Sequence, residues 1–220
     1  MNIIKDNVRL LAEQQLKTIG SLLNRLHRLL SEAKYSFTFV LILDHKSKNE
    51  DALNTFYIWR IYMMKKYKLD YESPIGIIEI MGTAEAITSI LFSEEDKSKN
   101  LLQAETPPVL KQCYKELDEY FKGCRKDFTF PYQFEGTDFQ KTVWKALREI
   151  PYGKTGAYKD IALSIENEKA VRAVGSANSK NKLSIVIPCH RIIGSTGKLT
   201  GYAGGLWRKE WLLKHEGYLK

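Results

Sequence analysis

The apolar positions change their spacing from one segment of the chain to the next. Between residues 5 and 32 they follow an approximately helical period, whereas residues 35–43 form a strand-like apolar run and residues 44–54 are polar, as in a loop. From residue 67 apolar and polar side chains alternate, and a turn at residues 73–76 leads to a second apolar run at 77–81. Together with a third run at 87–92, these segments predict an antiparallel meander.

The helical period returns after residue 108. Residues 110–121 follow it, and Gly123 stands where a glycine C-cap is expected. Thr137 and Gln140 form a capping box at the start of a second helix, which Pro151 ends. The predicted buried face of this second helix consists of Phe139, Val143, Leu147 and Ile150.

Two short helices follow, and they fit a helix-turn-helix. The first spans residues 158–165 with Ile161, Ala162 and Ile165 inward, and the second runs from an N-cap at Asn167 to about residue 177. Arg172 is the only long cation between residues 170 and 177. Such a pair indicates DNA binding, but it also occurs as packed core in proteins that touch no DNA.

The fold class predicted by these elements is α/β, of the α+β kind. Residues 65–135 form a small amino-terminal scaffold domain with an antiparallel sheet and a helix. Residues 136–220 form a mostly helical carboxy-terminal domain that holds the helix-turn-helix.

Charge and cysteine content narrow the functional classes. The net charge of +8 arises in residues 136–220, which carry 15 basic and 7 acidic side chains. A polyanionic partner explains this excess, and so does a merely soluble basic surface. Three cysteines form no disulfide framework, which is typical of a reducing cytoplasm, and no ligand spacing indicates a metal site. No apolar run is long enough for a membrane span, and no signal peptide is evident.

The candidate nucleophile is Cys189. An apolar run over residues 185–187, ended by Pro188, predicts a buried strand that holds this cysteine at its end. Its neighbours His190 and Arg191 are residue types that lower the pKa of a thiol and favour the reactive thiolate. A cysteine in such a place is otherwise a small buried hydrophobe without chemistry.

The residues around and after Cys189 carry a family resemblance. Pro-Cys-His-Arg at 188–191, Gly-Tyr-Ala-Gly-Gly at 201–205 and Trp-Leu-Leu-Lys-His-Glu at 211–216 follow one another. In order and spacing they resemble the O6-alkylguanine-DNA alkyltransferases, also called methylated-DNA–protein-cysteine methyltransferases. Residues 136–153 match a further signature of that family, so the resemblance covers nearly all of residues 65–217.

The resemblance implies DNA repair by direct reversal. The expected reaction is the irreversible, single-turnover transfer of a methyl or small alkyl group from O6-alkylguanine, and from O4-alkylthymine, in double-stranded DNA to the thiolate of Cys189. It implies no cofactor, and we expect a monomeric cytoplasmic protein.

The resemblance also assigns roles to individual residues. Cys189 would be the nucleophile and methyl acceptor, His190 its base, directly or through a water, and Glu216 the group that orients the imidazole. Tyr158 would donate a proton or hydrogen bond to guanine N3, and Asn181 would connect the helix-turn-helix to the active-site strand.

The remaining roles concern DNA. Arg172 would take the place of the flipped base in the stack, on a helix that enters the minor groove. The small residues that let this helix approach are Ala170, Ala173 and Gly175. Tyr202 would stack on the flipped base, and Ala203 and Gly204 would form the wall of its pocket.

Two other functions are alternatives to DNA repair. A Cys-His-Glu set also suits a cysteine hydrolase, for which no oxyanion hole is evident, and a non-catalytic lesion binder would carry tryptophan at position 189.

Residues 1–63 show no resemblance to the family, whose usual beginning corresponds to Met63 and Met64. They are predicted to be an atypical extension, either an accessory segment or an artefact of a mis-assigned start.

Overall fold

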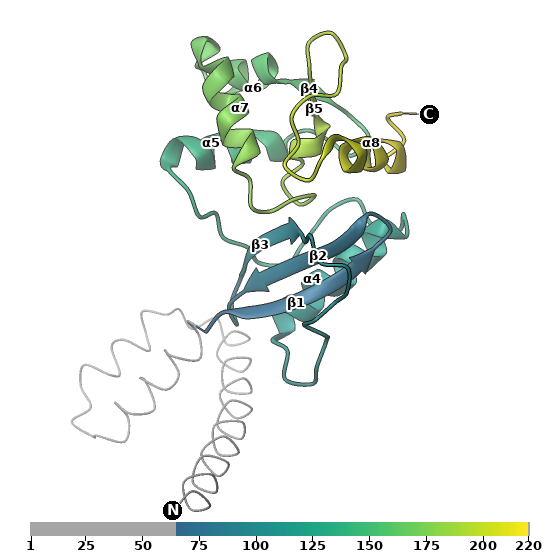
Figure 1. The fold of residues 1–220 in the computed structure, drawn as a ribbon. Helices are drawn as coiled ribbons and strands as arrows, with labels where there is room; N and C mark the ends of the chain where they lie inside the picture. The colour runs from purple at the N-terminus through teal and green to yellow at the C-terminus, as the bar shows by residue number, and fades with distance from the viewer. Residues whose placement is uncertain (1–64, 220) are drawn as a thin grey trace, which may run out of the picture. The chain divides into compact units, whose positions relative to one another are not determined.

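The structure, a computed structural model, describes residues 65–219. It begins with three strands, β1 (Tyr67–Ser73), β2 (Gly76–Gly82) and β3 (Ile87–Phe92), paired antiparallel in the order β1-β2-β3 (Figure 1). The predicted meander is therefore confirmed. The helix, strand and loop predicted between residues 5 and 54 lie outside the described residues.

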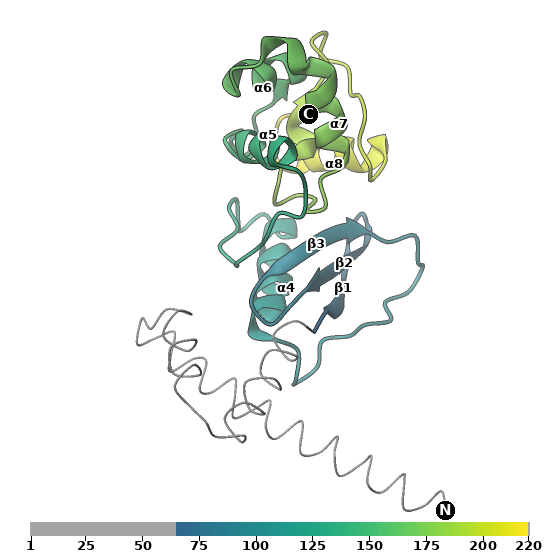
Figure 2. The ribbon, with the colours of Figure 1, turned by 90° about the vertical axis from the view of Figure 1, so that its left-hand side faces the viewer.

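Helix α4 (Pro108–Phe121) lies along one face of this sheet and contacts all three strands (Figure 2). Its buried positions, which include Leu110, Leu117 and Tyr120, recur at helical spacing, so burial of this face drives its docking. The helix begins with Pro108, whose fixed φ suits a first turn, and Gly123 beyond its end has the predicted positive φ of +74°.

The carboxy-terminal domain is built on three helices that contact one another, α5 (Asp138–Arg148), α6 (Tyr158–Ser164) and α7 (Val171–Ser179). The predicted capping box between Thr137 and Gln140 is present at the start of α5. The prediction that Phe139 is buried is wrong. The buried face of α5 is centred on Val143, Trp144 and Leu147, and Phe139 lies at its edge and is 36% exposed.

The second helix of the helix-turn-helix begins later than predicted. A 3₁₀ turn, η1 (Glu168–Ala170), precedes α7, and the side chain of Asn167 makes no capping hydrogen bond. Instead the backbone N–H of Ala170 donates to the carbonyl of Asn167. Glu166, between α6 and this 3₁₀ turn, has a positive φ of 56°, so the chain turns sharply there.

The predicted strand over residues 185–187 is wrong. These residues are buried, as expected, but they form turns, and Ile185 has φ of +72°. Just before them, Leu183 forms an isolated bridge with Ile90 of β3, and the chain then folds back, with the N–H of Ile187 donating to the carbonyl of Leu183. Burial thus explains the apolar run without extended backbone.

The last elements surround Cys189. The 3₁₀ turn η2 (Cys189–Arg191) leads into β5 (Ile192–Ile193), which pairs parallel with β4 (Gly156–Ala157). Helix α8 (Leu206–His215) ends the fold. Among residues 65–219 no helix is long and apolar enough to cross a membrane.

Candidate active site

Cys189 opens the turn η2, directly after Pro188, and its side chain is almost completely buried. The amide Nδ2 of Asn181 donates a hydrogen bond to its Sγ at 3.1 Å. The same Nδ2 donates to the carbonyl of Ile187, and the N–H of Leu183 donates to Asn181 Oδ1. Asn181 therefore joins the end of α7 to the turns around Cys189, whereas the connection predicted from the resemblance involved a strand.

The electrostatic surroundings of the thiol differ from those predicted. Burial raises the pKa of Cys189, while the hydrogen bond from Asn181 and the positive charge of Lys209 act in the opposite direction. The guanidinium of Arg191, which was predicted to favour the thiolate, is bound to Glu216. The cation that acts on the thiol is Lys209, 20 positions further along the chain.

Lys209 is a buried lysine on α8. Its Nζ donates to the backbone carbonyls of Ile192 and Thr200, the latter at 2.6 Å. Burial lowers the pKa of Lys209 to about 8, and the nearby Cys189 opposes that decrease. The ammonium is thus held by carbonyl groups close to the thiol.

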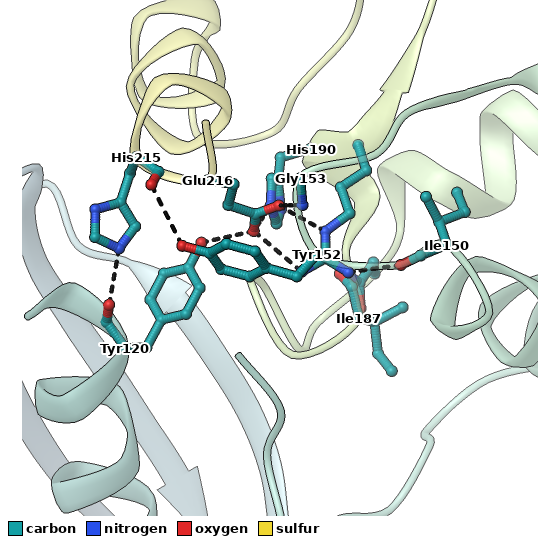
Figure 3. Close-up of polar contacts among 10 residues, drawn as sticks. Tyr120, Ile150, Tyr152, Gly153, Ile187, His190, His215 and Glu216 are labelled. Carbon is teal, nitrogen blue, oxygen red and sulfur yellow. Dashed lines mark hydrogen bonds and ion pairs between the residues drawn. The ribbon is translucent and has the colours of Figure 1, made fainter. Parts of the chain in front are cut away.

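His190 and Glu216, which the resemblance pairs, are in direct contact (Figure 3). The imidazole Nε2 and the carboxylate Oε1 lie 2.8 Å apart, and both side chains are buried. Burial lowers the pKa of His190 despite the opposing effect of Glu216. Because Glu216 accepts from Nε2, the other nitrogen, Nδ1, is the free acceptor; it is buried and has no partner among the described residues.

Glu216 is the most heavily hydrogen-bonded carboxylate of the site. Arg191 donates from Nε to Oε2 at 2.9 Å and from a terminal nitrogen to Oε1 at 3.0 Å, and the backbone N–H of Gly153 donates to Oε2. Burial acts to raise the pKa of Glu216, but His190 and Arg191 together hold it well below its usual range. A side chain at position 153 would collide with the carbonyl of Glu216, so glycine is required there.

A residue of the amino-terminal domain reaches the same carboxylate. The hydroxyl of Tyr120, on α4, donates to Glu216 Oε1 at 2.8 Å (Figure 3). Tyr120 was predicted only as a buried position of its helix, because nothing in a local pattern indicates a partner 96 residues away.

The predicted base pocket borders this cluster. The ring of Tyr202 lies 6.5 Å from that of His190 and 6.2 Å from that of Phe92 on β3. Gly204 packs against Phe92 so closely that a methyl group there would lie 2.6 Å from the ring, whereas Ala203 is exposed. Arg208 donates to the carbonyls of Gly204 and Ile75, which fastens this loop to the amino-terminal domain.

The predicted DNA-contacting residues lie on and beside α7. Arg172 and Ala173 are exposed, and Ala170 and Gly175 are half-buried. Tyr158 connects this helix to the pocket loop: a methyl group on Gly175 would lie 3.7 Å from its ring, and one on Gly201 would lie 3.4 Å from its hydroxyl oxygen. The fold therefore brings Cys189, His190, Glu216, Asn181 and Tyr202 together, whereas Arg172 and Ala173 lie exposed on α7.

Comparisons with known proteins identify the family of this chain. The family described as "6-O-methylguanine DNA methyltransferase, ribonuclease-like domain" matches residues 66–134, and its "DNA binding domain" matches residues 138–218. The methylated-DNA–protein-cysteine methyltransferase of Methanosarcina acetivorans is 46% identical over 153 residues, covering 69% of this chain and 98% of the relative. The constitutive enzyme of Bacillus subtilis is 44% identical over 144 residues, covering 63% and 87%.

Solved structures show the same relationship. The crystal structure of Mycobacterium tuberculosis O6-methylguanine methyltransferase aligns with a TM-score of 0.61 and 38% identity, covering 69% of this chain and 93% of that one. The same enzyme in complex with DNA aligns with a TM-score of 0.61 and 39% identity, covering 68% and 91%. On its residues, its fold and these relatives, the chain belongs to the O6-methylguanine-DNA methyltransferase family, the methylated-DNA–protein-cysteine methyltransferases.

Proposed function

We propose that Cys189 is the nucleophile and permanent methyl acceptor, with His190 as its base and Glu216 as the group that orients the imidazole and stabilises its cation. One observation carries this proposal: a buried thiol bonded by Asn181 directly precedes an imidazole that is fixed at Nε2 by a carboxylate and free at Nδ1. This arrangement matches a nucleophile with an oriented base.

The transfer is a displacement at carbon. The thiol proton passes to His190 Nδ1, directly or through a water, and Sγ attacks the methyl carbon of O6-methylguanine. The S–C bond forms as the C–O6 bond breaks, and the electron pair of that bond remains on guanine. Tyr158 transfers a proton to guanine N3, so that the base departs neutral, or donates a hydrogen bond there, which compensates part of the negative charge of the departing base. Glu216 stabilises the imidazolium that forms.

The burial of the thiol explains why several groups are needed. A thiolate inside the protein is costly unless charge or hydrogen bonds compensate it. Asn181 supplies a hydrogen bond and Lys209 a positive charge. We infer that both stabilise the thiolate during attack.

The exposed face of α7 supplies the DNA contact. The small residues Ala173 and Gly175 on α7, and Ala170 in the turn η1 just before it, allow the backbone to approach a groove, and Arg172 extends from the helix. The target base must leave the stack to reach a buried thiol, and a side chain that fills the vacancy reduces the cost of flipping. Tyr202, Ala203 and Gly204 then line the pocket for the flipped base.

A direct assay tests the function. Incubated with a duplex oligonucleotide containing one O6-methylguanine, the protein should restore guanine and gain the mass of a methyl group. The cysteine hydrolase alternative predicts turnover of an ester or peptide substrate instead. Restored guanine without a mass gain on the protein would contradict the proposed acceptor.

Arg172→Ala should slow repair of duplex DNA about tenfold, since the flipped state loses the group that fills the stack, equivalent to about 1.4 kcal/mol. Reaction with free O6-benzylguanine, which needs no flipping, should keep its rate. Single-turnover kinetics on the two substrates measure the difference. Lys169→Ala, which removes a neighbouring exposed cation, is the control and should affect duplex repair much less. Equal losses on both substrates would assign Arg172 to the fold or the pocket.

We propose that residues 1–63 are an extension outside the repair unit, with domains at 65–135 and 136–220. The family matches begin at residue 66, and the buried core described by the structure starts at Leu69. A chain that starts at Met64 should therefore fold and repair duplex DNA at the rate of the full chain. Thermal unfolding and single-turnover rates check this. Insolubility, or a rate more than about tenfold lower, would make the extension part of the functional unit.

We propose a cytoplasmic location. All three cysteines are free thiols, including the exposed Cys124, and free thiols are typical of a reducing compartment. Cell fractionation tests this, and recovery of the protein outside the cytoplasmic fraction would contradict it.

A further inference from the structure

Tyr120 connects the amino-terminal domain to the proposed base. It lies in the last turn of α4 and is completely buried, and its hydroxyl donates to Glu216 Oε1 at 2.8 Å (Figure 3). The imidazole Nε2 of His190 lies 2.8 Å from that same oxygen. Tyr120 and His190 therefore share one acceptor atom.

Sharing this oxygen has an electrostatic consequence. Each donor that binds a carboxylate oxygen neutralises part of its charge and weakens its attraction for the other donors. The remaining donors to Glu216 are Arg191 and the N–H of Gly153. Tyr120 is the donor to this carboxylate that comes from the amino-terminal domain, and its hydroxyl reduces the charge that faces the imidazole.

The position of the Tyr120 hydroxyl is fixed from several sides. Nε2 of His215, the residue before Glu216, lies 2.7 Å from the backbone carbonyl oxygen of Tyr120. The Tyr120 ring packs against those of Phe128, Tyr152 and His215, with centroids 5.1 to 6.2 Å away. Two consecutive residues at the end of α8 thus hold both the backbone and the hydroxyl of Tyr120.

We propose that Tyr120 is a positioning residue for methyl transfer, through which the amino-terminal domain sets how strongly Glu216 holds the imidazole of His190. This inference rests on the proposed role of His190 as the base. It gives the domain predicted to be a scaffold an indirect part in the reaction, through Glu216.

The other groups that act on His190 are known from the structure. Burial lowers the pKa of His190 most strongly, Glu216 raises it, and the positive charges of Arg191 and Lys209 lower it. Cys189 adjoins His190, and the ring of Tyr202 lies 6.5 Å away.

Tyr152, beside Tyr120, stays neutral because burial raises its pKa, with Glu216 acting in the same direction. Removal of the Tyr120 hydroxyl leaves these groups in place, so a change in the pKa of His190 reports on Tyr120.

The test is the pH dependence of methyl transfer by the full chain carrying Tyr120→Phe. His190 must be neutral to accept the thiol proton, so the single-turnover rate falls on the acidic side as the imidazole is protonated. Without the tyrosine hydroxyl, Glu216 Oε1 attracts the imidazolium more strongly. The acidic limb of the pH–rate profile, where the rate falls, should therefore move to higher pH by about half a unit or more. The rate at alkaline pH should stay within about threefold of that of the unmodified protein.

The matched control is Tyr71→Phe. Tyr71 is also nearly buried in the amino-terminal domain, and its hydroxyl donates to a carboxylate, Asp118, at 3.5 Å, but it has no contact with the site. Its profile should coincide with that of the unmodified protein. If Tyr120→Phe fails to fold, 3-fluorotyrosine at position 120, a stronger donor, should move the limb to lower pH.

The outcomes separate this inference from the proposed function. If the acidic limb persists in His190→Ala, the base role is refuted and the inference with it. If that limb disappears in His190→Ala but keeps its position in Tyr120→Phe, the inference alone is refuted. A uniform decrease at every pH, or an equal displacement in Tyr71→Phe, likewise refutes it, because Tyr120 would then act only through packing.

Discussion

Cys189→Ala should bind duplex DNA containing O6-methylguanine and transfer no methyl group, because it keeps α7 and the pocket loop but lacks the acceptor sulfur. The unmodified protein should take up one methyl per chain and then stop, however much substrate remains. A thioether is a poor leaving group, and neither the sequence nor the described site offers a group that would remove the methyl from Cys189. Mass spectrometry of the peptide that contains Cys189 identifies the residue that accepts the methyl group. Gel-shift titrations of both proteins measure their affinity for DNA.

The other cysteines provide the control for this prediction. Cys113 is buried in the amino-terminal core, where burial raises the pKa of its thiol well above the ordinary value, and Cys124 is exposed. Thiolate, not thiol, is the nucleophile, so Cys113 is unreactive, while Cys124 lies outside the described site. Cys124→Ala should therefore retain a stoichiometry of one. Repeated turnover, or methyl recovered on Cys113 or Cys124, would contradict the assignment of Cys189.

The elements predicted from periodicity are those in which one face is buried. The strands at residues 67–92 and the helix ending at Phe121 were found because their apolar side chains enter one core. The predicted strand before Cys189 was wrong for the same reason. Residues 185–187 are apolar because they are buried. The positive φ of Ile185, which turns the backbone, cannot be inferred from the pattern of apolar residues.

The candidate site was predictable where chemistry follows from neighbouring residues and a family pattern, and not where it depends on distant contacts. Arg191, next to the thiol in sequence, is turned toward Glu216, whereas Lys209 supplies the nearby charge. The sequence does indicate that Lys209 is buried. It stands three and four positions before the buried Leu212 and Leu213, so the helical period places it on the inward face of α8. A lysine there requires partners, which the carbonyls of Ile192 and Thr200 provide.

Glu216→Gln should be the most destabilising single change among the site residues, lowering the free energy of unfolding by about 3–5 kcal/mol at pH 7. Arg191 and His190 are buried and lose their carboxylate, and the amide nitrogen of glutamine would face a donor on one side of the group. Transfer should also slow, because the imidazolium loses its counter-charge. Urea unfolding gives the first quantity and single-turnover kinetics the second. A loss below about 1 kcal/mol would mean that Glu216 is not the electrostatic centre of the site.

The pH dependence of the same variant gives a second, independent check. The pKa of Glu216 is depressed in the folded protein, so its contribution is complete above the carboxyl pKa of the unfolded chain and is lost as the pH falls through the folded value. The difference in unfolding free energy between the unmodified protein and Glu216→Gln should therefore be constant above about pH 6 and should narrow below about pH 4.5. Glu119→Gln is the matched control, since Glu119 also pairs with an arginine, Arg125 at 2.7 Å, but in a half-exposed position. Glu119→Gln should lower the free energy of unfolding by less than about 1 kcal/mol at pH 7, because water screens the Glu119–Arg125 pair and replaces its hydrogen bonds.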